Sequence, residues 1–304
     1  MNDYLVLISG VACAGVGGEF FVRGSVGIAA WARISPGIVG ATVAAFATSS
    51  PEFAVSMSAA IVGEPKIALG DAMGSNLVNV AVILAIALAI SAMQCPRHSL
   101  KRDFPIALAV PIATAALCLD GRLSRLDGGL MLCVFVAWLF STVAEARQQR
   151  SAAEDVLVDR RLWVAIVHSV VGLLLLIVAG NWIVASARSI AISFGIDEFI
   201  IGATVVAAGT SVPELATAII SKLRGHGEVG LGAILGSNIF NGLLIVPVAA
   251  IISPIDLIWR EVAETLGFGL VAVLCAFPNR EGLIPRERCV LLFALYGAFL
   301  ARII

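Results

Sequence analysis

Residues 38–84 read IVGATVAAFATSSPEFAVSMSAAIVGEPKIALGDAMGSNLVNVAVIL, and residues 200–246 read IIGATVVAAGTSVPELATAIISKLRGHGEVGLGAILGSNIFNGLLIV. The two stretches align without a gap at a constant offset of 162 residues (200 minus 38), and about 19 of the 47 aligned positions are identical. The identities include polar residues, which packing alone does not require. Such self-similarity indicates an internal repeat, although an old duplication retained only for packing would leave a similar trace.

The composition indicates that the repeat lies in a membrane. Hydrophobic residues make up 60% of the 304 residues, charged residues make up 13%, and the mean hydropathy is +1.00. A soluble domain carries about 45–50% apolar and about 25% charged residues. The long apolar runs lack the period-two alternation of a membrane barrel. We therefore expect an all-α membrane protein, which excludes a nucleic-acid binder, a secreted disulfide scaffold and a cytosolic enzyme.

Short charged segments divide the apolar sequence into about ten transmembrane helices of roughly 20 residues or more. We expect them near residues 4–30, 36–62, 67–93, 103–119, 127–146, 162–192, 198–222, 229–252, 260–277 and 287–303. The longest polar gap lies at the midpoint, so the predicted units are a first repeat (1–146), a short cytoplasmic linker (147–161) and a second repeat (162–304). Equivalent helices are five apart, an odd number, so the two five-helix repeats have inverted topology, as in many secondary transporters.

The distribution of basic residues predicts that both termini face outward, because cytoplasmic loops are enriched in lysine and arginine. The N-terminus lacks a basic segment and a cleavage site, so we expect its apolar run to be a retained span. On this orientation the inward loops hold Arg33, Arg97, Lys101, Arg102, Arg147, Arg150, Arg160, Arg161, Lys222, Arg224, Arg280, Arg286 and Arg288. The outward side holds Lys66, Arg122, Arg125, Arg260 and Arg302.

The first repeated motif is TSSPE at 48–52, matched by TSVPE at 210–214. A carboxylate inside an apolar helix is costly and usually marks an ion or proton pathway. Threonine and glutamate are four residues apart and share a helix face. The proline disrupts the helix and is expected to free carbonyls near Ala47 and Gly209. The alternative is a kinked helix whose glutamate pairs with a basic residue, but neither motif contains one.

The second repeated motif is GSNLVN at 74–79, matched by GSNIFN at 236–241. Its serine and its last asparagine are also four residues apart and share a face, while glycine lets a neighbouring helix approach closely. This motif alone could serve only helix packing. Because it is duplicated beside the glutamate motif, we interpret it as the other wall of one site.

The repeated residues together offer carboxylate, hydroxyl, amide and carbonyl oxygens, without sulfur or imidazole. His98, His168 and His226 lie outside the motifs, and the six cysteines show no CxxC spacing and are interpreted as small hydrophobic residues. An all-oxygen site selects hard cations such as Na⁺ and Ca²⁺. Two glutamates balance one Ca²⁺ or two Na⁺, and when empty they are expected to take up protons.

These paired motifs resemble the α1 and α2 repeats of the sodium/calcium exchanger family, within the cation/calcium antiporters. The resemblance implies Na⁺ and Ca²⁺ as transported ions with no cofactor, and alternating access around a central site at which Glu52 and Glu214 bind the ions. It also implies that the first helix of each half slides past the other eight. The further oxygen ligands implied are the side chains of Thr48, Ser49, Ser75, Asn79, Thr210, Ser211, Ser237 and Asn241, and the carbonyls of Ala45 and Ala207.

Two departures from the family pattern stand out. Position 241 is aspartate in some relatives, so asparagine here leaves two carboxylates rather than three and weakens the case for potassium co-transport. The short linker also leaves no room for the large regulatory domain of eukaryotic exchangers. We therefore expect a minimal prokaryotic form in the inner membrane, whose partners are the transported cations and the lipid bilayer, with no nucleic acid and no required protein partner.

Three alternatives to Na⁺/Ca²⁺ antiport remain at this stage. A Ca²⁺/H⁺ antiporter, or an exchanger of another divalent cation, would use the same paired glutamates. An intramembrane enzyme is disfavoured, because neither a G-x-S-x-G elbow nor an HExxH signature is present. A passive channel is disfavoured because an internal inverted repeat already supplies the two-fold relation that channels often obtain by oligomerisation.

Overall fold

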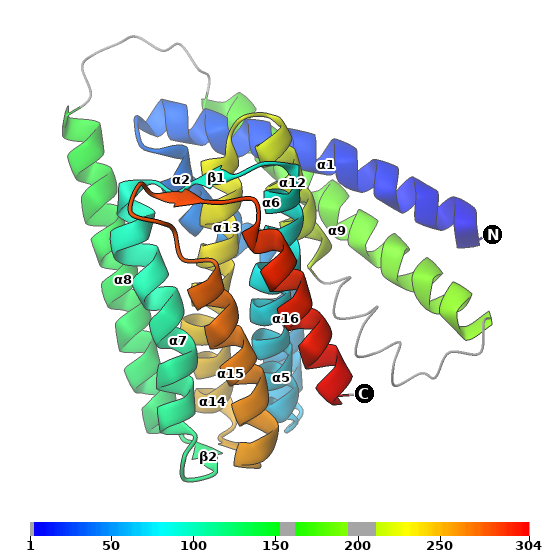
Figure 1. Ribbon diagram of the computed structural model, residues 1–304, viewed down its shortest axis with the longest axis vertical. Helices are drawn as coiled ribbons and strands as arrows, with labels where there is room; N and C mark the ends of the chain where they lie inside the picture. The colour runs from blue at the N-terminus through cyan, green and yellow to red at the C-terminus, as the bar shows by residue number, and fades with distance from the viewer. Residues whose placement is uncertain (1–2, 153–161, 194–210, 304) are drawn as a thin grey trace.

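Helices account for most of the residues that the computed structural model describes, which are residues 3–152, 162–193 and 211–303 (Figure 1). The first part of the chain forms α1 (Asp3–Ala32), α2 (Pro36–Val39), η1 (Gly40–Ala44), α3 (Ala45–Thr48), α4 (Ser50–Ile61), α5 (Pro65–Val78), η2 (Asn79–Leu84), α6 (Ala85–Ile90), η3 (Ser99–Asp103), α7 (Phe104–Leu117) and α8 (Arg125–Ala152). The later part forms α9 (Leu162–Ser193), α12 (Val212–Leu223), α13 (Gly227–Phe240), η5 (Asn241–Ile245), α14 (Val246–Ile252), α15 (Trp259–Cys275) and α16 (Arg288–Ile303). The predicted all-α class is therefore confirmed, and α8 continues six residues beyond the predicted end at 146.

Several of these helices are long and apolar enough to cross a membrane. Within the described ranges five qualify alone: Asp3–Ala32, Pro65–Ile90, Arg125–Arg150, Leu162–Ala187 and Gly227–Ile252. A sixth results if the bent pair Pro36–Thr48 and Ser50–Ile61 counts as one span. Large apolar side chains such as Leu126, Phe140 and Trp163 lie on the outer surface. In water they would be unfavourable, but in a bilayer they face lipid tails.

The bend predicted from the TSSPE motif is present. The helix axis turns by 47° at a break between Thr48 and Ser50, directly before Pro51. Proline has no N–H and its ring clashes with the preceding turn, so a helix rarely continues straight through it. The carbonyl of Ala47, which we expected to be free, instead accepts a hydrogen bond from Ser50 Oγ at 2.7 Å. A hydroxyl one turn away thus supplies the donor that the broken helix lacks.

Two short antiparallel ladders join loops of the two halves. The strand β1 (Met93–Gln94) pairs with β4 (Leu283–Ile284), and β2 (Arg122–Leu123) pairs with β3 (Ile255–Asp256). Adding the repeat offset of 162 to Met93 gives Ile255, so β1 and β3 are equivalent segments. In Figure 1, β1 lies at one end of the bundle, and β2, which carries β3 beside it, lies at the opposite end.

The helices α1 and α9 lie side by side and run obliquely to the rest of the bundle (Figure 1). Their contact is lined by small residues, which allow the two backbones to approach closely. Gly10 of α1 faces Ile183 of α9, and Gly24 faces Ser169, so the two helices are antiparallel. A Cβ at Gly17 would lie 3.0 Å from the Leu176 nitrogen, so even alanine would be crowded there.

The helix α13 lies at the centre of the bundle and is buried along almost its whole length. It packs against α2, η1 and α3, and glycines make the approach possible. A Cβ on Gly236 would lie 2.6 Å from Ala45 Cβ. The predicted close approach at the GSN motif is thus found in the second copy, whereas a Cβ on Gly74 of the first copy would meet no described atom within 4 Å.

Candidate functional site

Two of the predicted site residues, Thr210 and Ala207, lie outside the described residues. The structure gathers the other ten into the bundle's interior, and each is at most 5% exposed. They come from the bent helix α3–α4, from the junctions of α5 with η2 and α13 with η5, and from the start of α12. The ten residues are Ala45, Thr48, Ser49, Glu52, Ser75, Asn79, Ser211, Glu214, Ser237 and Asn241.

Glu214 shares a compact cluster of oxygens with two serines of other elements. Ser49 Oγ donates to Ser237 Oγ at 2.9 Å and lies 3.3 Å from Glu214 Oε1. Ser237 Oγ lies 3.5 Å from the same carboxylate oxygen. The cluster joins residue 49 of the first half to residues 214 and 237 of the second. The two halves of the chain therefore meet at this cluster.

Five oxygens of the site have no hydrogen-bond partner among the described residues. One is the hydroxyl oxygen of Ser211, which can donate or accept. The other four are one carboxylate oxygen from each glutamate and one amide oxygen from each repeated asparagine, namely Glu52 Oε2, Glu214 Oε2, Asn79 Oδ1 and Asn241 Oδ1. Buried polar atoms are normally paired, so each unpaired atom requires an explanation. These four are all acceptors, and they form two pairs related by the repeat. A bound cation would satisfy acceptors and would not satisfy donors.

The negative charge of the site is not neutralised by a basic residue in the described part of the chain. The ion pairs found there involve other acidic residues, such as Asp103 and Glu19, and none involves Glu52 or Glu214. The two glutamates are close enough to interact electrostatically. Two buried carboxylates without a counter-charge are unfavourable unless a cation or a proton accompanies them. The alternative of a glutamate paired with lysine or arginine finds no support.

The predicted backbone ligand Ala45 is already engaged within its own helix. Its carbonyl accepts the Ser49 N–H at 2.9 Å and Thr48 Oγ1 at 3.3 Å. A carbonyl oxygen has two lone pairs, so both are used in the structure as it stands. Ala45 can act as a ligand only if one of these bonds is released.

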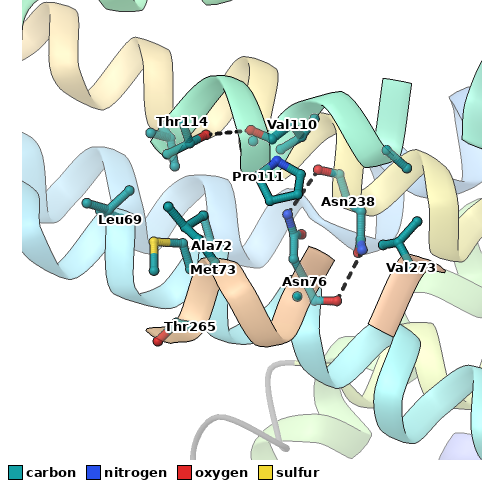
Figure 2. A pocket seen from close by; sticks show the side chains of 15 residues that line it. Leu69, Ala72, Met73, Asn76, Val110, Pro111, Thr114, Asn238, Thr265 and Val273 are labelled. Carbon is teal, nitrogen blue, oxygen red and sulfur yellow. Dashed lines mark hydrogen bonds between the residues drawn. The ribbon is translucent and has the colours of Figure 1, made fainter. Parts of the chain in front are cut away.

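Two asparagines that we did not predict as site residues connect the helices behind the site. Asn76 Nδ2 donates to the Asn238 backbone oxygen, and Asn238 Nδ2 donates to the Asn76 backbone oxygen, both at 3.1 Å (Figure 2). Asn241 Nδ2 then donates to Asn76 Oδ1, and Asn79 Nδ2 donates to Asn238 Oδ1, both at 3.0 Å. The sequence signal was present, because residues 76 and 238 are identical and 162 apart.

Asn79 and Asn241, which we call the outer asparagines, each begin a π-helical segment. Asn79 is the first residue of η2 and Asn241 is the first residue of η5. Short π-helical segments are rare and occur frequently at functional sites. Their occurrence at equivalent positions extends the relation between the two halves from sequence to backbone geometry.

A pocket borders the asparagine pair (Figure 2). Asn76 and Asn238 lie at one edge of it, and most of the remaining lining is apolar, including Met73, Val110 and Val273. None of the predicted ligand residues lines it. An apolar pocket has no means of binding a hard cation, so it is separate from the candidate ion site.

The ligand chemistry of the described residues is that of hard oxygen donors. No group of three or more histidine, cysteine, aspartate or glutamate side chains forms a conventional metal cluster in the described segments. The six cysteines are free thiols. Helices that bury acidic and neutral oxygens inside an apolar bundle are typical of cation transporters. The fold and the buried oxygens are therefore those of a helical membrane transporter for cations.

Comparison with known proteins identifies the family within this class. The model of the sodium/calcium exchanger protein family matches residues 3–144 and 164–304, so this chain belongs to that family. The chain is 34% identical to the "Putative antiporter CaxA" of Alkalimonas amylolytica over 91% of each chain. It is 27% identical to the sodium/calcium exchanger MaX1 of Methanosarcina acetivorans, covering 98% of this chain and 97% of MaX1.

A solved structure of the sodium–calcium exchanger NCX_Mj, soaked with Na⁺ and Sr²⁺, has the same fold. It superposes with a TM-score of 0.84 at 28% identity, covering 99% of this chain and 98% of that chain. The protein is thus an integral membrane transporter of the exchanger family and not an enzyme.

Proposed function

We propose that the protein exchanges Ca²⁺ for Na⁺ across the membrane by alternating access around a central site formed by Glu52 and Glu214. The observation that carries the proposal is the set of four buried acceptor oxygens without described partners, two from glutamates and two from asparagines. An all-oxygen set of this kind suits Na⁺ and Ca²⁺. The names of relatives, which include sodium/calcium exchangers, agree with this choice of ions.

The charge of the proposed site supports exchange of these two ions. Two carboxylates neutralise one Ca²⁺ or two Na⁺, so either load balances the charge of the two glutamates. Neutral oxygens of Thr48, Ser49, Ser75, Ser211 and Ser237 would complete the coordination, together with Thr210 and the carbonyls of Ala45 and Ala207. Sodium and calcium would then compete for the same oxygens.

Alternating access would follow from an inverted repeat of two five-helix halves, the first ending with α8 at Ala152 and the second comprising residues 162–304, giving ten spans in all. Three observations support inversion. Equivalent segments β1 and β3 lie at opposite ends of the bundle (Figure 1). The asparagine bonds occur as reciprocal pairs. The close-packed pair α1 and α9 consists of equivalent helices, as expected if they move as one unit against the rest.

The proposed location is the inner membrane of a prokaryote with both termini outside. Two observations support it: the excess of basic residues in the loops assigned to the inside, and the 36% identity to the inner membrane protein YrbG of Escherichia coli over 73% of this chain and 71% of YrbG. Labelling of Lys66→Cys and Arg286→Cys, each in a background without the six native cysteines, tests the orientation in intact cells. Only Lys66→Cys is expected to react with an impermeant reagent.

A transport assay tests the exchange directly. Purified protein is reconstituted in liposomes loaded with Na⁺, the pH is held equal on both sides, and ⁴⁵Ca²⁺ uptake is measured. Uptake that requires internal Na⁺ and collapses when external Na⁺ is raised supports Na⁺/Ca²⁺ antiport. Uptake that is unaffected by the sodium gradient contradicts it.

A Ca²⁺/H⁺ antiporter is the second candidate, and one observation favours it. The glutamates have no basic partner among the described residues, so protons are the simplest way to neutralise them when no metal is bound. The same liposomes without sodium, but with an acidic interior, separate the two candidates. Calcium uptake under the pH gradient alone identifies H⁺ as the coupling ion.

A further inference from the structure

We propose that Asn76 and Asn238 are positioning residues that fix the amide orientation of Asn79 and Asn241, so that the carbonyl oxygens of the latter face the transported cation. The inference rests on the proposed function, because it assigns a role within the same site. It depends on which amide atoms can donate a hydrogen bond and which can only accept one.

Backbone carbonyls set the amide orientation of the inner pair, Asn76 and Asn238. Asn76 Nδ2 lies 3.1 Å from the Asn238 backbone oxygen, and Asn238 Nδ2 lies 3.1 Å from the Asn76 backbone oxygen (Figure 2). A carbonyl oxygen can only accept, so each of these contacts requires the NH₂ side of the amide. A flipped amide would place two acceptors against each other. The Oδ1 atoms of Asn76 and Asn238 are therefore held on the other side.

The inner pair in turn sets the amide orientation of the outer pair, Asn79 and Asn241. Asn76 Oδ1 is 3.0 Å from Asn241 Nδ2, and Asn238 Oδ1 is 3.0 Å from Asn79 Nδ2. Because an amide oxygen accepts, the outer asparagines must present their NH₂ groups to it. Their own Oδ1 atoms then point away from this contact. Both are buried and lack a hydrogen-bond partner among the described residues.

The result is a pair of acceptor oxygens held in place by the opposite half of the protein. We call the two bonds from Asn76 Oδ1 and Asn238 Oδ1 to the outer amides the clamp. Without it, each outer amide could rotate and present its NH₂ group, which repels a cation, in place of its oxygen. Preorganisation of ligands by the groups behind them is a common requirement of ion sites. The bonds cross between halves, so Asn76 of the first half orients Asn241 of the second, and Asn238 orients Asn79.

This crossed pattern gives a selective test. In Asn76→Ala the backbone oxygen of residue 76 remains and still accepts from Asn238, so the Asn238–Asn79 branch stays intact. Only the orientation of Asn241 is lost. Since one neutral oxygen ligand then loses its fixed orientation, we expect about a tenfold higher Ca²⁺ concentration for half-maximal effect, which corresponds to about 1.4 kcal/mol.

The experiment measures Ca²⁺ affinity in two ways, by ⁴⁵Ca²⁺ uptake into sodium-loaded liposomes and by the rise in unfolding temperature with Ca²⁺ in detergent. Asn76→Ala is made alone, in an Asn241→Ala background and in an Asn79→Ala background. We expect the tenfold effect to persist beside Asn79→Ala and to shrink below twofold beside Asn241→Ala. Thr114→Val, at the opposite edge of the same pocket, is the matched control and should leave affinity within twofold.

The outcomes distinguish the clamp from the function on which it rests. A wild-type protein that neither takes up Ca²⁺ nor is stabilised by it overturns both proposals. A wild type that binds Ca²⁺, with Asn76→Ala acting equally in both backgrounds, overturns the clamp alone. A loss of stability in Asn76→Ala without a change in Ca²⁺ affinity also overturns it. If Asn76→Ala fails to fold, the mirror set of Asn238→Ala with Asn79→Ala and Asn241→Ala is tested with the pairing reversed.

Discussion

Changing Glu214 to glutamine removes one negative charge from the buried cluster while keeping its shape. The Oε1 atom of the wild-type residue lies 3.3 Å from Ser49 Oγ and 3.5 Å from Ser237 Oγ, and the glutamine carbonyl can accept from both hydroxyls. No basic residue in the described part of the chain loses a partner. We therefore expect Glu214→Gln to fold normally, with an unfolding temperature in the absence of cations equal to or above that of the wild type.

Cation binding should be affected far more than folding. An uncompensated buried charge costs about 3–5 kcal/mol, and a Ca²⁺ ion held by one carboxylate leaves one such charge. At about 1.4 kcal/mol for each factor of ten, Ca²⁺ affinity is expected to fall by about two to nearly four orders of magnitude. Sodium-driven ⁴⁵Ca²⁺ uptake should then be undetectable at micromolar Ca²⁺. Glu52→Gln is expected to behave in the same way.

The control for this prediction is Glu264→Gln, which makes the same chemical change on α15. Glu264 Oε1 pairs with Arg302 at 3.0 Å, and the arginine side chain is 62% exposed. An exposed pair contributes at most about 1 kcal/mol, so uptake should match the wild type. Wild-type calcium flux in well-folded Glu214→Gln or Glu52→Gln would falsify the assignment of these carboxylates to the ion site.

Three further predictions test the packing and the polar contacts around the site. Gly236→Ala places a Cβ 2.6 Å from Ala45 Cβ, and this overpacking should lower the free energy of unfolding by about 1–3 kcal/mol and slow transport. The measurements are a lower unfolding temperature and slower ⁴⁵Ca²⁺ entry into liposomes. Asp103→Asn removes the charge of a fully buried carboxylate and leaves one of its two contacts to Arg102 (2.7 Å and 3.1 Å) without an acceptor oxygen. Denaturation in detergent should show a loss of about 1–3 kcal/mol. Burial lowers the pKa of His98, so the unfolded chain binds the proton more readily than the folded one. The folded state is therefore expected to lose stability as the pH drops below about 6.5, and thermal scans of His98→Asn should no longer show this dependence.

Local features of the fold could be predicted from the sequence because local forces determine them. The bend before Pro51 follows from a ring clash within one helical turn, and the structure shows it at the expected place. The burial of Glu52 and Glu214 followed from their position inside apolar repeats. The end of α8 was placed too early because the polar residues 147–152 were interpreted as a linker, whereas helix hydrogen bonds continue through them to Ala152.

Features that depend on partners from the other half could not be predicted in the same way. Helical spacing identifies which residues share a face, but not which atoms of a distant helix they meet. Asn76 was therefore overlooked as a site residue, although its partner Asn238 is its counterpart in the repeat. The two-residue strands, such as β1 against β4, were missed because a pairing of about 190 residues' separation leaves no periodic signal. Identity between the two copies at positions 76 and 238 is the sequence signal for this pair.

The unpaired charge of the proposed site would also make the transporter exchange one ion load for another. The transporter would not release its ions and then return to the opposite facing state with an empty site. Moving the bundle between its two facing states with both glutamates ionised and no cation would carry two uncompensated buried charges, at several kcal/mol each. One Ca²⁺ or two Na⁺ removes that cost, as two protons would. Each transition with a load is therefore favoured over the empty transition by several powers of ten. A basic residue paired with Glu52 or Glu214 would remove this penalty and permit the empty site to return, so its absence from the described contacts is what the proposed coupling requires.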